Sequence, residues 1–131
     1  MDIINKKIDA YIDAHTDIEP EVLKLLNRET HLKVLLPRML SGHFQGRVLS
    51  MISKMIKPDR ILELGTYTGY SAICLSEGLT EGGKLTTIDI NAELEPFVRS
   101  FFDKAGVNNK IDYIIGDGTK VVPELNEKFD L

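Results

Sequence analysis

Apolar positions near the start of the chain recur at the spacing of a helix. Ile4, Ile8 and Ile12 lie four residues apart, which predicts an amphipathic helix over residues 3–14. A second helix is predicted from residue 20 to residue 30, because Pro20 suits a first helical turn and an apolar run follows it. We interpret both helices as packing and oligomer surface rather than as catalytic elements.

The next stretch, residues 32–40, is apolar but contains Pro37, so a loop or a broken helix is expected there. Ser41 is predicted to cap a third helix, in which large apolar residues line one face. The residues of that face are Phe44, Val48, Leu49, Ile52, Met55 and Ile56.

From residue 57 onward, short apolar runs alternate with helical patterns. The predicted strands lie at 61–64, 84–90 and 111–115, and the predicted helices at 70–78, 92–105 and 119–126. This alternation is typical of a parallel sheet, and right-handed crossovers order its strands 3-2-1. The predicted fold class is therefore α/β: the N-terminal half of a doubly wound, Rossmann-like parallel sheet, preceded by N-terminal helices.

Residues 129–131 are predicted to begin a fourth strand. Ligands of such sheets bind at the carboxyl ends of the strands, where the order switches from strand 1 to strand 4. Strand 1 is expected to lack its usual neighbour on that side, and a free apolar edge promotes pairing with another chain. We therefore expect either a chain truncated after the third strand or an association, most simply a homodimer, that fills the gap.

Composition narrows the class of protein further. The 131 residues are 43% hydrophobic and 27% charged, with a formal net charge of −4, which fits a globular protein and favours neither nucleic-acid nor anionic-membrane binding. The single cysteine, Cys74, allows no internal disulfide and fits a reducing compartment. There is no apolar run of membrane-spanning length and no signal-peptide pattern, so a cytoplasmic location is expected.

The candidate chemistry lies in the turn between Gly65 and Gly69. A dinucleotide fingerprint has a middle glycine beside the pyrophosphate, but Tyr67 stands there, and no P-loop Gly-Lys-Ser/Thr follows. The turn therefore suits a nucleoside without a pyrophosphate. Asp89 ends the second strand, where a carboxylate accepts hydrogen bonds from ribose hydroxyls. Together these features indicate S-adenosylmethionine.

The string from Glu63 to Ser71, Glu-Leu-Gly-Thr-Tyr-Thr-Gly-Tyr-Ser, resembles the cofactor motif of class I O-methyltransferases of the catechol/caffeoyl-CoA type. That family includes bacterial members that act on small phenols or on tRNA hydroxyuridine. The resemblance covers residues 36–131. It implies two parts: residues 1–56 as a cofactor lid and oligomer surface, and residues 57–131 as a partial S-adenosylmethionine-binding domain.

The resemblance and the residues together give a set of candidate cofactor-binding positions. Glu63 is expected to support the turn or the cofactor's ammonium group, Ser71 to suit its carboxylate, and Asp89 to bind the ribose. Simpler structural interpretations remain open, with Met39 as core filler, Ser41 as a helix cap and Asp89 as a cap for the helix after it. The full candidate set is Met39, Ser41, Glu63, Gly65, Thr66, Tyr67, Ser71, Asp89 and Gly118.

The resulting hypothesis is the cofactor-binding portion of an O-methyltransferase acting on a hydroxylated small molecule. In the resembling family a divalent cation, usually magnesium, assists the reaction, but its first aspartate ligand falls after residue 131. No catalytic or metal residue is therefore assigned, and the chain alone is expected to be inactive. Two alternatives remain: a nicotinamide-dependent dehydrogenase half-domain, disfavoured by the missing glycine, and a non-catalytic, self-associating fragment.

Overall fold

A three-stranded parallel sheet lies at the centre of the protein. The computed structural model describes residues 4–131, so the predicted helix start at Ile3 lies outside the described residues. Strands β1 (Arg60–Leu64), β2 (Lys84–Asp89) and β3 (Ile111–Ile115) run parallel, with β2 in the middle. Leu85 pairs with Ile61 on one side and with Ile111 on the other. The predicted α/β class and the strand order 3-2-1 are confirmed.

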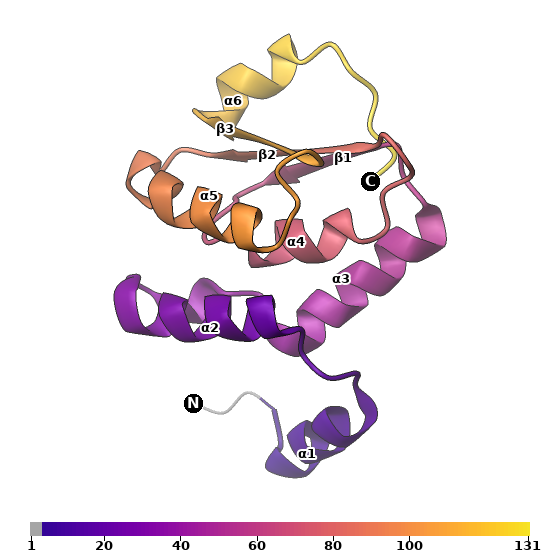
Figure 1. Ribbon diagram of the computed structural model, residues 1–131, viewed down its shortest axis with the longest axis vertical. Coiled ribbons are helices and arrows are strands. Elements are labelled where there is room, and N and C mark those ends of the chain that lie inside the picture. The colour runs from indigo at the N-terminus through magenta and orange to yellow at the C-terminus, as the bar shows by residue number, and fades with distance from the viewer. Residues whose placement is uncertain (1–3) are drawn as a thin grey trace.

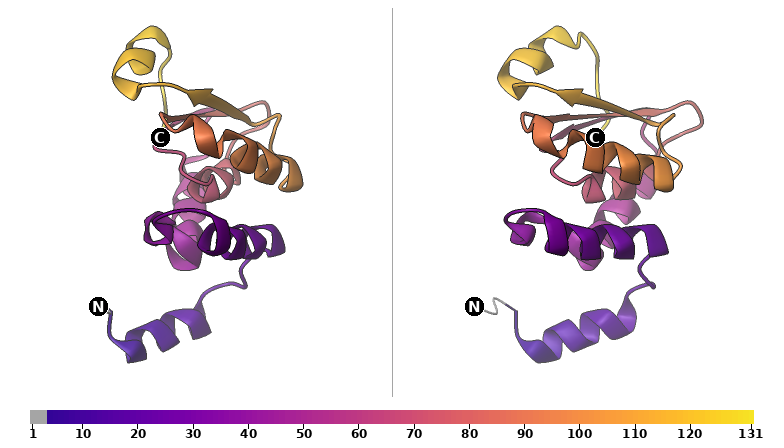
Figure 2. Two further views of the ribbon diagram at one scale, coloured as in Figure 1. Left: turned by 90° about the vertical axis from the view of Figure 1, so that its left-hand side faces the viewer. Right: turned by 60° about the vertical axis from the view of Figure 1, so that its left-hand side comes forward.

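The helices form layers on the sheet (Figure 1). They are α1 (Lys6–His15), α2 (Glu21–Lys33), α3 (Gly42–Ile56), α4 (Tyr70–Ser76), α5 (Glu95–Lys104) and α6 (Gly118–Val121), with 3₁₀ turns at Pro37–Met39, Ala92–Leu94 and Val122–Glu124. Helices α4 and α5 cover one face of the sheet, α2 and α3 lie beyond them, and α6 lies over the opposite face. Helix α1 stands apart from the other helices in every view (Figures 1 and 2).

The last residues of the chain lie along the outer edge of β1. The Asp130 N–H donates to the Arg60 carbonyl at 2.8 Å, and the Leu62 N–H donates to the Leu131 carbonyl at 2.9 Å. The Asp130 carboxylate also accepts the N–H groups of Asp59 and Arg60, each at 2.9 Å. The expectation that β1 has no neighbour on this side is therefore wrong for this stretch, because residues 130 and 131 supply one.

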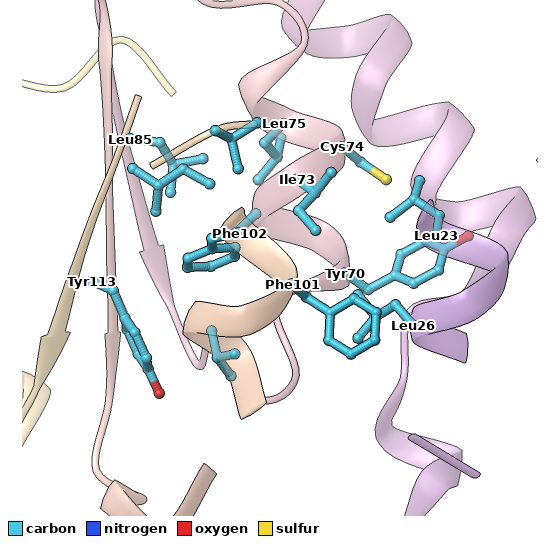
Figure 3. Packing of buried hydrophobic residues seen from close by; sticks show 14 of the residues in the cluster. Leu23, Leu26, Tyr70, Ile73, Cys74, Leu75, Leu85, Phe101, Phe102 and Tyr113 are labelled. Carbon is cyan, nitrogen blue, oxygen red and sulfur yellow. The ribbon is translucent and has the colours of Figure 1, made fainter. Parts of the chain in front are cut away.

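One apolar core joins the sheet to the two helical layers (Figure 3). Its buried members come from α2, all three strands, α4, α5 and the turn after α5. They are Leu23, Leu26, Ile61, Tyr70, Ala72, Ile73, Cys74, Leu75, Leu85, Val98, Phe101, Phe102, Val107, Ile111 and Tyr113. Cys74 is fully buried, and burial raises the pKa of its thiol to about 11.

Helix α3 packs through small residues, although large apolar residues line one of its faces. Its buried positions are Gly46, Ser50 and Ser53, whereas Phe44 is 49% exposed and Met55 is 76% exposed. The reason is the closeness of α4: a Cβ atom on Gly46 would lie 2.7 Å from Cε1 of Tyr70, inside contact distance. The hydrophobic pattern finds large residues, but a close helix contact selects small ones.

The N-terminal helix α1 buries none of its residues. Asn5 caps it by accepting the Lys7 N–H at 2.9 Å, which explains its start at Lys6. Ile8 and Tyr11, two of the residues that predict the helix, remain exposed. The periodicity therefore locates the helix correctly but leaves its apolar stripe without a partner among the described residues.

Candidate functional site

The candidate site begins where β1 ends and turns into α4. Gly65 and Gly69 both have φ of +91°, a conformation that favours glycine. The Gly65 N–H donates to the Ile88 carbonyl at 2.8 Å, which holds the turn against the end of β2. The two glycines serve different needs: a Cβ on Gly69 would lie 2.7 Å from Phe102, whereas one on Gly65 would meet nothing within 4 Å. The surface at Gly65 is therefore open.

Asp89 joins the second strand to this turn. Its Oδ2 accepts the Tyr67 N–H at 2.8 Å, and its Oδ1 accepts the Asn91 N–H at 2.9 Å. The cap of the following 3₁₀ turn is Asn91, whose side chain accepts the Glu93 N–H, so the interpretation of Asp89 as that cap is wrong. Asp89 instead fixes Tyr67, which has the unusual φ of +49°.

Glu63 lies beneath the turn in a network of hydroxyl groups. Ser71 donates to its Oε2 and Thr87 donates to its Oε1, both at 2.6 Å. The Thr66 and Thr87 hydroxyls are in turn 2.6 Å apart. Because Thr87 gives its proton to Glu63, Thr66 is the donor of that third bond. Glu63 makes no ion pair among the described residues, so hydroxyl groups are its polar side-chain partners.

This environment changes the acidity of Glu63. Burial raises the pKa of the Glu63 carboxyl, and the hydrogen bonds from Ser71 and Thr87 offset only part of that rise. Thr87 is not among the site residues predicted from the sequence. It stands two residues before Asp89 on the same strand, so the two-residue period of a strand could have placed both side chains on one face.

Residues 35–41 lie over the turn, and we call this segment the roof. The Tyr67 hydroxyl lies 3.0 Å from the Leu35 carbonyl and 3.1 Å from the Leu36 carbonyl, so one proton is shared between two acceptors. Leu36 has a φ of +56° and is, like Tyr67, a non-glycine residue in the left-handed region. The Tyr67 side chain thus holds the roof to the turn, a contact that no local sequence signal predicts.

Beneath this roof lies a small pocket of about 40 Å³. Its lining residues are Met39, Leu40, Ser41, Gly65, Thr66, Tyr67, Thr68, Tyr70 and Ser71. Met39 is exposed rather than core filler. Ser41 precedes α3 but makes no capping hydrogen bond, because its backbone is already helical, so the predicted cap is wrong. The structure brings six of the nine candidate residues to this pocket.

The remaining candidates lie around it. Glu63 and Asp89 contact pocket residues directly, through Ser71 and Tyr67. Gly118 begins α6, and a Cβ there would lie 3.5 Å from the Leu64 side chain, so glycine is not required by packing. A hollow of about 580 Å³ between α3 and residues 15–17 lies away from the site.

The histidines do not contribute to the site. His15 and His31 contact backbone carbonyls of their own helices, and His43 lies 2.6 Å from the Asp17 carbonyl. Among residues 4–131, no three His, Cys, Asp or Glu side chains are grouped so that they could hold a metal ion. Within that same range, no helix has the length and apolar character needed to cross a membrane.

Comparison with known proteins identifies relatives over most of the chain. The O-methyltransferase family model matches residues 12–131. A putative caffeoyl-CoA O-methyltransferase of Arabidopsis thaliana is 38% identical over 112 residues, which are 84% of this chain and 48% of the relative. Catechol O-methyltransferase of Mus musculus is 31% identical over 90 residues, or 69% of this chain and 34% of the relative.

The fold is shared with solved structures as well. The O-methyltransferase TomG from Streptomyces achromogenes, crystallised with S-adenosylmethionine, superposes with a TM-score of 0.83 at 28% identity, covering 92% of this chain and 54% of TomG. The chain spans between a third and a half of the length of the curated relatives it matches.

Proposed function

The chain belongs to the O-methyltransferase family, and from this premise we propose that it binds S-adenosylmethionine at the carboxyl ends of β1 and β2. The activity proposed for the whole protein is methyl transfer to a hydroxyl group. The observation that carries the proposal is the hydrogen bond between the Tyr67 N–H and the Asp89 carboxylate, which joins the glycine turn to the end of the second strand.

Asp89 fits the ribose of such a cofactor. Each of its carboxylate oxygens accepts one N–H, from Tyr67 or from Asn91, and each oxygen keeps a further lone pair for a ligand hydroxyl. The two N–H bonds hold the carboxylate in place before any ligand arrives, which lowers the entropy lost on binding. The open surface at Gly65 leaves room for the ligand beside this carboxylate.

The pocket under the roof fits the amino-acid end of the cofactor. Its volume of about 40 Å³ admits one small polar group, so the nucleoside would lie outside it, toward Asp89. Glu63 supplies negative charge close to Ser71 in the pocket wall, which suits an ammonium group. Met39 and Ser41 would close the pocket from the roof, and Gly118 would lie on the adenine side.

When bound, S-adenosylmethionine supplies an electrophilic methyl group on its sulfonium centre. The residues of this chain bind the cofactor, orient it and exclude water from its charged end, and alignment of this kind is a major source of catalysis in transfer reactions. We propose a divalent cation only for a longer chain of this family. Residues 4–131 contain no group of side chains that fits one, and no step is assigned to it.

We propose a hydroxylated small molecule, of the catechol or phenol class, as the acceptor. Support comes from the names of the relatives, which include a catechol and a caffeoyl-CoA O-methyltransferase. Methylation of tRNA by the whole protein in place of a small phenol would overturn this part of the proposal. A cytoplasmic location is part of the same proposal, supported by the single buried thiol.

We also propose that the protein is a homodimer, in which α1 of one copy covers α3 of the other. The hollow of about 580 Å³ on α3 is lined by apolar side chains, among them Phe44 and Met55, and by Arg47 and Lys54, which both pair with Glu77. Exposed apolar surface of this kind marks interaction sites.

Helix α1 has the complementary character. Its exposed stripe carries Ile8 and Tyr11, and Asp9 and Asp13 flank the stripe with negative charge. Light scattering should give twice the mass of one chain, and Ile8→Lys should give the monomer mass. A monomeric unsubstituted protein at micromolar concentration would contradict the homodimer.

Calorimetric titration with S-adenosylmethionine tests the central proposal. Asp89→Asn should weaken binding about tenfold, because the neutral amide offers the ribose hydroxyls one acceptor oxygen, whereas the carboxylate offers two charged oxygens. The matched control is Asp112→Asn on β3, an exposed aspartate away from the pocket, which should bind normally. Binding of NAD without S-adenosylmethionine would favour the dehydrogenase alternative and overturn the proposal.

A further inference from the structure

The side chain of Tyr113 on β3 is buried, yet its hydroxyl has no hydrogen-bond partner. The residue is 8% exposed, and its Oη is one of the few buried polar side-chain atoms without a partner among the described residues. Phe102 packs edge-on against the ring at 5.9 Å, and the Arg99 guanidinium lies 5.1 Å from the ring centroid. A buried tyrosine hydroxyl usually has a partner, so an orphaned one needs an explanation.

The direction of this hydroxyl links it to the candidate site. Tyr113 pairs with Thr87 in the parallel register, and Asp89 lies two residues further along β2, on the same face of the sheet. Figure 3 shows the hydroxyl pointing away from the cluster of Phe101 and Phe102. The orphaned group and the proposed ribose acceptor thus share one face near the carboxyl end of the sheet.

The charges around Tyr113 keep its hydroxyl protonated. Burial, together with the carboxylates of Asp89 and Glu95, raises the pKa of Tyr113 to about 12, although Arg99 opposes the rise. Glu95 is itself paired with Arg99 at 2.7 Å. The hydroxyl is therefore a neutral hydrogen-bond donor at physiological pH. Its proton has no acceptor, although the carboxylates of Asp89 and Glu95 are near enough to affect its pKa.

We propose that Tyr113 is a further cofactor-binding residue, whose hydroxyl donates to the nucleoside part of the ligand bound at Asp89. This inference rests on the proposed function, because it names a partner within the same site. It explains why a polar group is kept buried and unpaired in the free protein: the partner arrives with the ligand. Phenylalanine would fill the same space in the core without this cost.

Tyr113→Phe tests the inference by two measurements that move in opposite directions. In the free protein the variant should unfold at the same temperature or higher, because an unpaired buried hydroxyl is removed. Its affinity for S-adenosylhomocysteine and for 5′-methylthioadenosine, which keeps the nucleoside but lacks the amino acid, should fall about tenfold. A purely structural tyrosine would lose stability and affinity together.

Asp112→Asn on the same strand, an exposed side chain away from the pocket, is the control and should change neither measurement. Normal ligand affinity in Tyr113→Phe, with ligand bound by the unsubstituted protein, would overturn the inference and leave the proposed function intact. A lower unfolding temperature of the free variant would also overturn it, because the hydroxyl would then have a partner without ligand. Failure of the unsubstituted protein to bind either ligand would overturn both proposals.

Discussion

A glutamate lies beside each end of helix α4, Glu63 on β1 next to its start and Glu77 at its C-cap, and the two have different kinds of partners. At the start of the helix, Glu63 is held by neutral hydroxyl groups, and burial raises the pKa of its carboxyl. At the other end, Arg47 contacts Glu77 through two nitrogens at 2.8 and 3.1 Å, and Ser50 donates to it at 2.5 Å. Burial of Glu77 also favours a higher pKa, but these donors outweigh it and leave the pKa lowered.

The glycines near the two ends of α4 also differ, in how much space surrounds them. Gly65, before the helix, has open space where a side chain would begin, whereas a Cβ on Gly78, after the helix, would lie 2.2 Å from the Ser53 carbonyl carbon. The end of α4 near Gly78 is closed, because it packs against α3 and Glu77 pairs with Arg47 of that helix. The end near Gly65 is open, because no atoms fill the space beside this glycine, and hydrogen bonds to Glu63 hold it. The contacts that stabilise the fold and the groups available to a ligand are thus separated along one short helix.

The largest effect on stability is expected from alanine at Gly78, and alanine at Gly65 provides the comparison. Gly78→Ala forces backbone apart between α3 and α4 and should lower the free energy of unfolding by roughly 3 kcal/mol or more. Gly65→Ala meets no atoms but must adopt a positive φ, at a cost of about 1–2 kcal/mol. Urea unfolding of the two variants measures the difference. A Gly78→Ala protein as stable as Gly65→Ala would show that the closed end is not closed in solution.

An intermediate effect is expected from Glu77→Gln, which leaves Arg47 without its counter-charge. The two side chains remain 27% and 16% exposed, so the loss at neutral pH should be about 1–2 kcal/mol, less than for a fully buried pair. Because the folded-state pKa of Glu77 is lowered, its contribution is present above the unfolded-state pKa and is lost as the pH falls through the folded-state value.

Glu63→Gln should give the opposite pH dependence. The folded-state pKa of Glu63 is raised, so its contribution to stability is present below the unfolded-state pKa and is lost as the pH rises through the folded-state value. Urea unfolding at several pH values should therefore show the Glu77→Gln deficit shrinking toward acid. The Glu63→Gln variant should compare best with the parent at neutral pH. Parallel pH profiles for the two variants would contradict the contrast between the ends of α4.

The smallest effect is expected from Tyr67→Phe, which releases the roof at the open end. Its hydroxyl shares one proton between the Leu35 and Leu36 carbonyls, so the loss of stability should be about 0.5–1 kcal/mol. Hydrogen exchange should report it locally, through faster exchange at the Met39 and Leu40 N–H groups of the roof. Unchanged exchange there would show that other contacts hold the roof.

Much of the fold follows from short-range signals in the sequence. The bounds of β3 were predicted to the residue, and Gly106 has the left-handed conformation expected of a helix stop, with φ of +68°. The packing of α3 through Gly46, Ser50 and Ser53 was not predicted, because it depends on how closely α4 approaches, and only the folded chain sets that distance. The predicted end of α2 falls three residues short of Lys33 because its stop signal is weak.

The candidate site was predictable where it lies on strand ends and glycines. Asp89 and the Gly65–Gly69 turn stand where strand periodicity and turn chemistry place them, although their binding roles stay predictions. The bonds that organise the site were not predictable. The Tyr67 hydroxyl reaches back more than thirty residues to the roof, and Thr87 reaches Glu63 from a neighbouring strand. Such contacts depend on tertiary packing and have no local pattern.

The small-residue packing of α3 leaves Met51 and Met55 on its outer surface, where oxidants would act first. Met39, Met51 and Met55 are each more than half exposed, while the core sulfur is the shielded thiol of Cys74. Peroxide should therefore convert surface thioethers to polar sulfoxides before it reaches the core. The chain would stay folded, since α3 holds α4 through Gly46 and Ser53. The chemical damage would fall on the outward apolar surface and would first weaken the proposed homodimer.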